Sequence, residues 1–247
     1  MLALTSLALM AAFVFGAAPA SANHSWNGYH WARTANPFTL KVVDSNTPDW
    51  DDNLGGAITD WSKSPVLDLT SEAGDSSSRA RKRCVMISGK IHSCNAAYGS
   101  NGWLGLASIN ISGGHITQGS AKMNDSYFSS PSYNETARQH VMCQEIGHDF
   151  GLTHQDESGA DLNTCMDYAN ALDNPSPNQH DYDQLQTIYQ HLDSTTTIGA
   201  AVAGLPDAVP SWAPASQKTK SVYVDQLADG TELVTFVLWA NPIHAWR

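Results

Sequence analysis

The stretch Gln144-Glu145-Ile146-Gly147-His148-Asp149-Phe150-Gly151-Leu152-Thr153-His154 decides the fold of this chain. Met142, Ile146 and Phe150 are spaced by four residues, which predicts a helix, opening at Ser132 or Asn134, with one face in the core. A glycine at position 151 can adopt the left-handed conformation that commonly ends a helix. The sequence therefore predicts a helix that closes with a sharp turn, after which His154 returns toward the helix.

A second face of the same helix carries residue types that bind metals. His140, Gln144 and His148 follow one another at intervals of four, with Glu145 at the border of the stripe. A rotation of about 100° per residue places them on one side of the helix. Side chains at this spacing can share one ion, and a carboxylate one residue further on can reach a bound water without ligating the metal. The helix and its turn together predict a metal site that includes His148 and His154.

These residues resemble the signature of the metzincin clan of zinc metalloproteases, in particular its matrixin-like and related secreted bacterial members. That signature is His-Glu-x-x-His-x-x-Gly-x-x-His, followed by a methionine turn. The resemblance extends over roughly residues 36–192 and leaves the C-terminal residues uncovered. The matching residues are Glu145, His148, Gly151, His154 and Met166, the last within Thr164-Cys165-Met166-Asp167-Tyr168.

The resemblance implies a role for each matching position. His148 and His154 would ligate zinc, and Glu145 would be the general base toward the metal's water. Met166 would form the apolar floor beneath the metal, and Tyr168 would help to stabilise the tetrahedral intermediate. The strand expected at 115–123 would be the sheet edge on which an extended peptide substrate binds by strand addition.

Gln144 stands where the signature has its first histidine. An amide oxygen is a neutral and weaker zinc donor than an imidazole, so the expected zinc affinity is lower. The favoured interpretation keeps Gln144 as the third zinc ligand. His140 is an alternative, but it lies one turn, about 5–6 Å, further along the helix. A site with two histidines plus water or an aspartate, and a helix without a functional metal, are the remaining alternatives.

The rest of the chain predicts an α/β fold of the α+β kind. The resemblance implies a twisted mixed sheet with an active-site helix and a C-terminal helix, and a small β-hairpin appendage follows. The hairpin is expected around the turn at Asp229-Gly230. Periodicity and turn residues predict strands at 38–43, 66–70, 85–92, 103–111 and 115–123, helices at 49–61, 132–150 and 178–192, a polar loop at 71–83, and hairpin strands at 221–224 and 232–239.

Changes in composition along the chain predict four segments. Residues 1–22 predict a signal peptide, because an apolar run ends in the small-residue pattern Ala20-Ser21-Ala22. An uncleaved membrane anchor is the alternative, since the run is near the minimum length for spanning. Residues 23–193 form the expected catalytic domain, 194–218 a linker rich in Ser, Thr, Ala and Pro, and 219–247 the C-terminal hairpin extension.

Charge and cysteine content restrict the environment and the partners. The formal net charge of −11 argues against nucleic acid as a partner. After signal cleavage we expect a secreted, extracellular protein without membrane attachment, acting on a protein or peptide. Four cysteines in such a chain predict two disulfides, for which three connectivities exist. The short spacing favours Cys84–Cys94, which leaves Cys143–Cys165.

An acidic segment follows the last histidine of the motif. Asp156, Glu157 and Asp161 are hard oxygen ligands of the kind that calcium prefers, so a calcium site is possible there. Their spacing does not fit an EF-hand loop.

Two functions from different classes fit the sequence. The first is a secreted zinc-dependent endopeptidase with Glu145 as its base. The second is a catalytically inactive secreted binding protein on the same scaffold, motivated by Gln144 at a ligand position.

Overall fold

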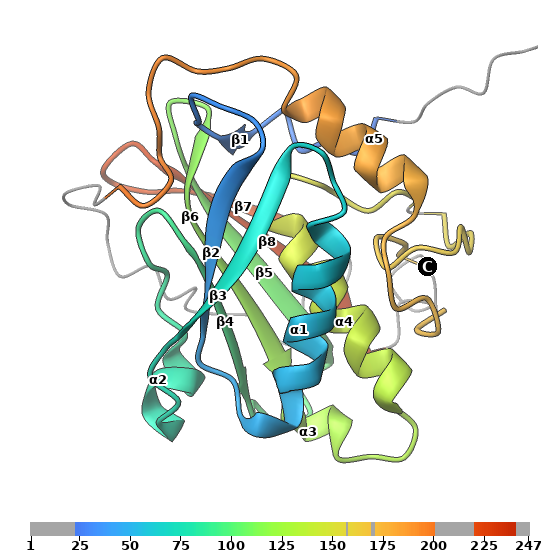
Figure 1. The fold of residues 1–247 in the computed structure, drawn as a ribbon. Coiled ribbons are helices and arrows are strands. Elements are labelled where there is room, and N and C mark those ends of the chain that lie inside the picture. Colours follow the sequence, from blue (N-terminus) through green and yellow to red (C-terminus); the bar gives the residue numbers. More distant parts are fainter. Residues whose placement is uncertain (1–22, 157, 169–170, 201–219, 241–247) are drawn as a thin grey trace, which may run out of the picture.

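The computed structural model describes residues 23–156, 158–168, 171–200 and 220–240 (Figure 1). The expected signal peptide, most of the expected linker and Glu157 lie outside these residues. The strands are β1 (His30–Trp31), β2 (Phe38–Asp44), β3 (Leu67–Ala73), β4 (Ile91–Ala96), β5 (Trp103–Ser112), β6 (His115–Asn124), β7 (Val222–Gln226) and β8 (Glu232–Trp239). The helices are η1 (Pro48–Trp50), α1 (Asp51–Trp61), α2 (Ser78–Arg83), α3 (Asp125–Phe128), α4 (Glu135–His148) and α5 (Gln179–Ile188).

All the described strands belong to one mixed, eight-stranded sheet with the order β3-β2-β4-β6-β5-β8-β7, and β1 pairs with β6. The half that contains β3, β2, β4 and β6 is parallel, whereas β5, β8 and β7 join antiparallel to their neighbours. The predicted α/β class with a mixed sheet is therefore confirmed.

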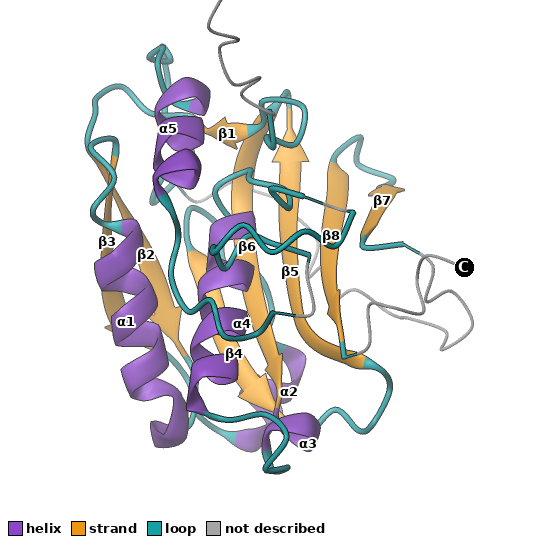
Figure 2. Ribbon diagram, turned by 90° about the vertical axis from the view of Figure 1, so that its right-hand side faces the viewer, coloured by secondary structure: helices purple, strands orange, loops and turns teal. Residues whose placement is uncertain are grey.

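Helices α1 and α4 lie side by side against one face of this sheet (Figure 2). The Asn134 side chain accepts a hydrogen bond from the Ala137 N–H at 3.0 Å and so caps the start of α4. At the other end Gly151 has φ +91°, and a Cβ there would collide with the Tyr29 carbonyl oxygen. Glycine is required at this turn for both reasons.

The three residues predicted to anchor α4 in the core are fully buried. Met142, Ile146 and Phe150 each have 0 % exposure. Phe150 contacts Trp61 of α1 in a T-shaped arrangement, with ring centroids 5.5 Å apart. This packing holds the face of α4 that carries Gln144 and His148 at a fixed orientation relative to the sheet.

Three predictions about the central segments are wrong. The strand predicted at 85–92 is shifted along the chain, because β4 begins only at Ile91 and continues to Ala96. The strand at 115–123 is not a sheet edge, because β6 lies between β4 and β5 and pairs with both. The polar loop predicted at 71–83 includes the end of β3 and helix α2, whose first turn is capped by the Ser77 side chain. The position of β6 in the sheet is set by pairing with distant segments, and alternation within the strand does not report it.

The C-terminal hairpin forms, but it extends the main sheet. Strand β8 pairs antiparallel with β5 over almost its whole length, from Trp103↔Trp239 to Ile111↔Glu232, and β7 pairs with β8. From Leu233 to Trp239 every side chain of β8 is buried, on both faces. The prediction that this strand belongs to a separate appendage is therefore wrong. A strand that is buried on both faces lies inside a covered sheet, with other residues packed above and below it.

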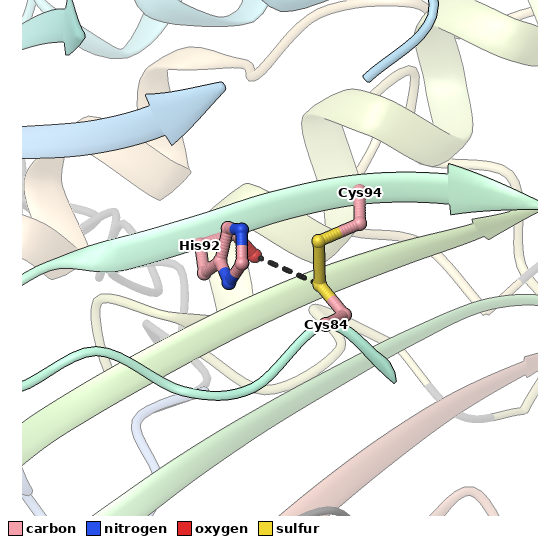
Figure 3. A group of neighbouring side chains, drawn as sticks. All are labelled: Cys84, His92 and Cys94. Atoms are coloured by element: carbon pink, nitrogen blue, oxygen red, sulfur yellow. Dashed lines mark hydrogen bonds between the residues drawn. A yellow bond between two sulfur atoms is a disulfide. The ribbon is translucent and has the colours of Figure 1, made fainter. Parts of the chain in front are cut away.

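Both predicted disulfides are present, Cys84–Cys94 and Cys143–Cys165. Figure 3 shows the first beside His92, whose carbonyl oxygen lies 3.6 Å from Cys84 Sγ. The His92 ring is held by Val85 O at 2.6 Å and Ser45 Oγ at 2.8 Å. The two sulfurs are bonded to each other, so this group does not offer a metal site. Among the described residues no helix has the length and apolar character needed to cross a membrane.

Candidate metal centre

The two motif histidines meet at the end of α4. His148 lies in the last turn of the helix, and the glycine turn returns His154 to it, so that the ring centroids are 4.9 Å apart at an angle of 81°. Both residues are buried, with 1 % and 3 % exposure. The structure thus brings together two imidazoles that the sequence placed on a helix and beyond a turn.

The hydrogen bond of His148 determines which nitrogen can bind a metal. Its Nδ1–H donates to the carbonyl oxygen of Leu152 at 2.9 Å, so the lone pair is on Nε2. Such a hydrogen bond orients metal-binding histidines and fixes their tautomer. Burial, followed by the proximity of His154, holds the pKa of His148 well below its usual value, and this keeps the ring neutral.

Gln144 is oriented in the way that a ligand role requires. Its Nε2 donates to the carbonyl oxygen of Asp167 at 2.8 Å, which assigns the other end of the amide as oxygen. Oε1 is buried, and among the described residues no group donates a hydrogen bond to it. A buried, unpaired acceptor costs about 1–3 kcal/mol, and a metal ion would remove that cost.

Glu145 lies against β5. A Cβ on Gly105 would collide with its Oε1, so this glycine makes room for the carboxyl group. Within the described residues neither carboxyl oxygen has a hydrogen-bond partner. Burial, followed by the proximity of Asp149, raises the pKa of Glu145 well above its usual value. Burial therefore favours the protonated form of Glu145 in this structure.

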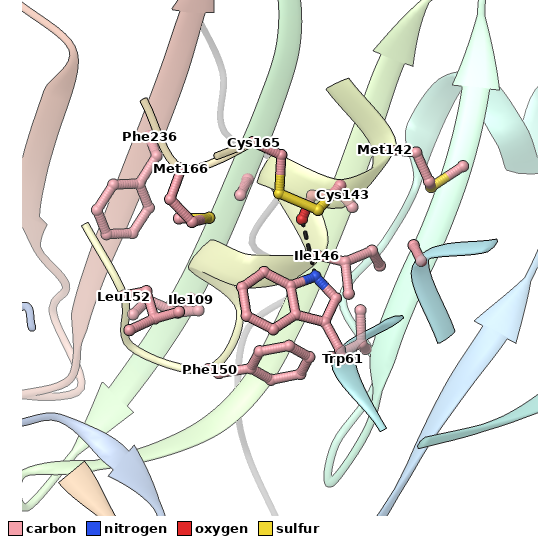
Figure 4. Packing of buried hydrophobic residues seen from close by; sticks show 14 of the residues in the cluster. Trp61, Ile109, Met142, Cys143, Ile146, Phe150, Leu152, Cys165, Met166 and Phe236 are labelled. Carbon is pink, nitrogen blue, oxygen red and sulfur yellow. Dashed lines mark hydrogen bonds between the residues drawn. A yellow bond between two sulfur atoms is a disulfide. The ribbon is translucent and has the colours of Figure 1, made fainter. Parts of the chain in front are cut away.

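The methionine turn is fixed beneath α4 by one covalent and one packing contact. The Cys143–Cys165 disulfide joins the helix to the turn. A Cβ on Gly147 would approach Met166 Sδ to 2.5 Å and Trp61 Cζ2 to 2.6 Å, so Gly147 allows the turn to pack closely. Figure 4 shows these side chains grouped around the disulfide.

Tyr168 lies beside His154 because two short backbone segments run together. The Gln155 N–H donates to Met166 O at 2.7 Å, and the Tyr168 N–H donates to Asp156 O at 3.2 Å. The rings of His154 and Tyr168 are 4.5 Å apart, at 40°. The phenol is thus adjacent to a candidate ligand, as a role in stabilising charge requires.

Neither His140 nor the acidic segment joins the centre. His140 donates from Nδ1 to Asn174 O at 2.8 Å. Among the described residues it does not form a three-ligand group with His148 and His154. Asp156 and Asp161 use Oδ1 to accept hydrogen bonds from their own loop, from Ser158 N at 2.8 Å and Asn163 N at 3.1 Å. The predicted calcium site stays a prediction, because its third residue, Glu157, lies outside the described residues.

Sequence reasoning missed the segments that enclose the centre. In the N-terminal segment before β1, which the sequence left without a predicted element, Trp26 N–H donates to Gly151 O at 2.8 Å, and His24 O accepts from Thr153 N–H at 2.6 Å. From the other end of the chain, Phe236 of β8 stacks on His148 with centroids 4.3 Å apart and planes 4° apart. An aperiodic segment and a distant strand carry no local signal for such contacts.

No protein-family model matches the chain, and no curated protein matches it as a relative.

Proposed function

We propose that this chain is a secreted zinc-dependent endopeptidase. Gln144 Oε1, His148 Nε2 and His154 would hold the metal, Glu145 would act as general base, and Tyr168 would stabilise developing negative charge. The cysteine pairs are consistent with an oxidising, extracellular compartment.

The orientation of Gln144 is the observation that carries this proposal. A glutamine with a purely structural role would use both ends of its amide when buried. Here the amide nitrogen is anchored to the Asp167 carbonyl, and Oε1 is left without a partner on the face that carries His148. The donor set of two imidazoles and one oxygen suits zinc, and it is the type that leaves a position for water and substrate.

The residues around the centre support a hydrolytic mechanism. When bound, zinc supplies Lewis acidity that polarises the scissile carbonyl and makes water a better nucleophile. Glu145 accepts the proton of the attacking water and passes it to the leaving amine. Tyr168 donates from its hydroxyl to the oxyanion. Met166 and the disulfide keep the helix and the turn at constant separation, which preserves the ligand geometry.

Substrate access requires displacement of β8. In the closed arrangement β8 covers the side of β5 at which an extended peptide would add a strand, and Phe236 covers His148. When β8 leaves, water reaches Glu145 and its pKa falls, because burial is the main cause of the raised value. Opening therefore also converts Glu145 from an acid into a base.

The proposal is tested with purified mature protein and an unstructured protein substrate such as casein. We expect cleavage that is abolished by chelator, restored by zinc, and reduced by about 10²–10⁴-fold in Glu145→Ala. A matched control is Glu135→Ala, at the start of the same helix and 10 residues before Glu145 in sequence. Unaltered cleavage in Glu145→Ala would contradict the mechanism.

A second candidate function is supported by one specific observation, the enclosure of His148 by Phe236. On this alternative the chain is an inactive binding protein on a protease scaffold. It predicts substoichiometric zinc and no cleavage even after β8 is displaced. Metal content and cleavage, measured on the same preparation, distinguish the two functions.

A further inference from the structure

Four metal-binding side chains from three distant segments meet away from the candidate metal centre. His30 lies in β1 and His115 is the first residue of β6, and these two residues are register partners. His191 and Asp193 follow the end of α5. The fold, and not local sequence, places them together.

The separations of three of the four donor atoms, those of His30, His191 and Asp193, are those of ligands around one ion. His30 Nε2 lies 3.1 Å from His191 Nε2 and 3.5 Å from Asp193 Oδ1. The same carboxylate oxygen lies 3.3 Å from His115 Nε2 and 3.7 Å from His191 Nε2. Ligands about 2.0 Å from a tetrahedral zinc ion are about 3.3 Å from one another. The distances among His30, His191 and Asp193 lie close to that value, and these three residues form a group whose donor atoms are all within 4.8 Å of one another. His115 approaches the group at the shared Asp193 oxygen.

His30 has the tautomer of a metal ligand. Its Nδ1–H donates to the Gly28 carbonyl oxygen at 2.8 Å, so the neutral ring has its lone pair on Nε2. That lone pair faces the Asp193 carboxylate, which is also an acceptor. Two facing acceptors repel one another unless the ring is protonated or a cation lies between them.

Asp193 is held so that only one of its oxygens faces the histidines. Its Oδ2 accepts from the Arg33 backbone N–H at 3.1 Å and from Arg33 Nη1 at 2.9 Å. Arg33 also donates from Nη2 to the His191 carbonyl oxygen. Ligating carboxylates are typically anchored in this way by outer hydrogen bonds. Oδ1 is thereby presented to all three imidazoles.

We infer that His30, His191 and Asp193, with His115 as the fourth ligand, form a second zinc site. A donor set of imidazoles and one carboxylate favours zinc over calcium or magnesium, which prefer oxygen. The ion would join β1, β6 and the segment after α5, so its role is structural. The side chains of His115 and His191 are 32 % and 50 % exposed, which provides a path for metal entry. This site does not depend on the proposed protease function.

The test measures zinc binding in the full mature chain after metal removal. His148→Ala is the background, because it removes a ligand of the candidate metal centre. In this background we expect one equivalent of zinc, and a tetrahedral Co²⁺ spectrum in the visible when cobalt replaces zinc. His191→Gln, the most exposed ligand, should weaken zinc binding by about 10-fold to 100-fold, and His115→Gln by a similar factor.

The matched control is His24→Gln, in the neighbouring group His24, His180 and Asp181, which also offers three donor atoms within 4.8 Å. His24→Gln should leave the one equivalent of bound zinc unchanged. Near-ultraviolet circular dichroism of each variant checks that the fold is retained. The inference is overturned if the His148→Ala protein binds no zinc, if His191→Gln and His115→Gln bind it unchanged, or if His24→Gln is the variant that loses it.

Discussion

Phe236 lies flat on the imidazole of His148, with ring centroids 4.3 Å apart and planes only 4° apart. The two residues are 88 positions apart, and they meet because β8 pairs with β5. A neutral imidazole suits such a stack, and the low pKa of His148 keeps it neutral. The contact covers one face of the His148 ring in the candidate metal centre.

Phe236→Ala should open the centre. Removing a buried phenylalanine costs about 3 kcal/mol or more, and this loss falls mainly on the pairing of β8. Each 1.4 kcal/mol changes a population about tenfold, so the open population should rise about a hundredfold. We expect faster zinc loss to a chelator and faster cleavage of casein.

The control for Phe236→Ala is Leu69→Ala in β3, at the other end of the sheet. It removes a buried side chain without touching β8. Equal acceleration in both variants would mean that general destabilisation, and not displacement of β8, exposes the centre.

Gln144→His should tighten zinc binding, because an imidazole is a better donor than an amide oxygen. We expect the dissociation constant to fall by about tenfold or more, equivalent to about 1.4 kcal/mol. Gln144→Leu, which has a similar volume and no oxygen, should raise it. Competition with a chromophoric chelator measures both. Equal affinities in the glutamine and leucine proteins would exclude Gln144 as a ligand.

Loss of the Cys143–Cys165 disulfide should destabilise the fold and weaken metal binding together. The bond closes a loop with a sequence separation of 22, and a cross-link of this length contributes about 3 kcal/mol. The double variant Cys143→Ala, Cys165→Ala is compared with Cys84→Ala, Cys94→Ala, whose loop separation is 10. The free energy of unfolding, measured in urea, should fall in both double variants. Zinc affinity should fall only in the Cys143→Ala, Cys165→Ala protein.

His140 makes stability depend on pH. Burial lowers its pKa from 6.5 to about 4, so between these values the unfolded chain binds a proton that the folded protein excludes. The free energy of unfolding therefore falls as the pH falls from about 6.5 to about 4, by about 3 kcal/mol in total. Urea unfolding of metal-free protein should show a weaker acid dependence in His140→Gln. An unchanged dependence would contradict the assignment to His140.

Local patterns accounted for the helix and its turn. The apolar residues Met142, Ile146 and Phe150 are buried as their spacing predicts, and Gly151 takes the positive φ expected at the end of a helix. The cysteine pairs could also be predicted, since two short separations left one connectivity favoured. These features depend on neighbours within a few turns of the chain.

The position of the strands could not be predicted in this way. The segment at 115–123 has the pattern of a strand, but the pattern does not state which strands lie beside it. Pairing with β8 changed β5 from an edge into an internal strand, and β6 was never an edge. Alternation within a strand reports which faces are buried, and not the order of strands in the sheet.

The sequence by itself determined that residues 140–154 form a helix and a turn, and that His140, Gln144 and His148 share one face of the helix, because side-chain spacing on a helix is a local geometric property. Only the tertiary structure decided the orientation of the Gln144 amide, which depends on the carbonyl oxygen of Asp167 on another segment. Only the tertiary structure placed Phe236 on His148 and gathered three histidines around Asp193. These arrangements arise from contacts between segments far apart in the chain, and local periodicity carries no information about such contacts.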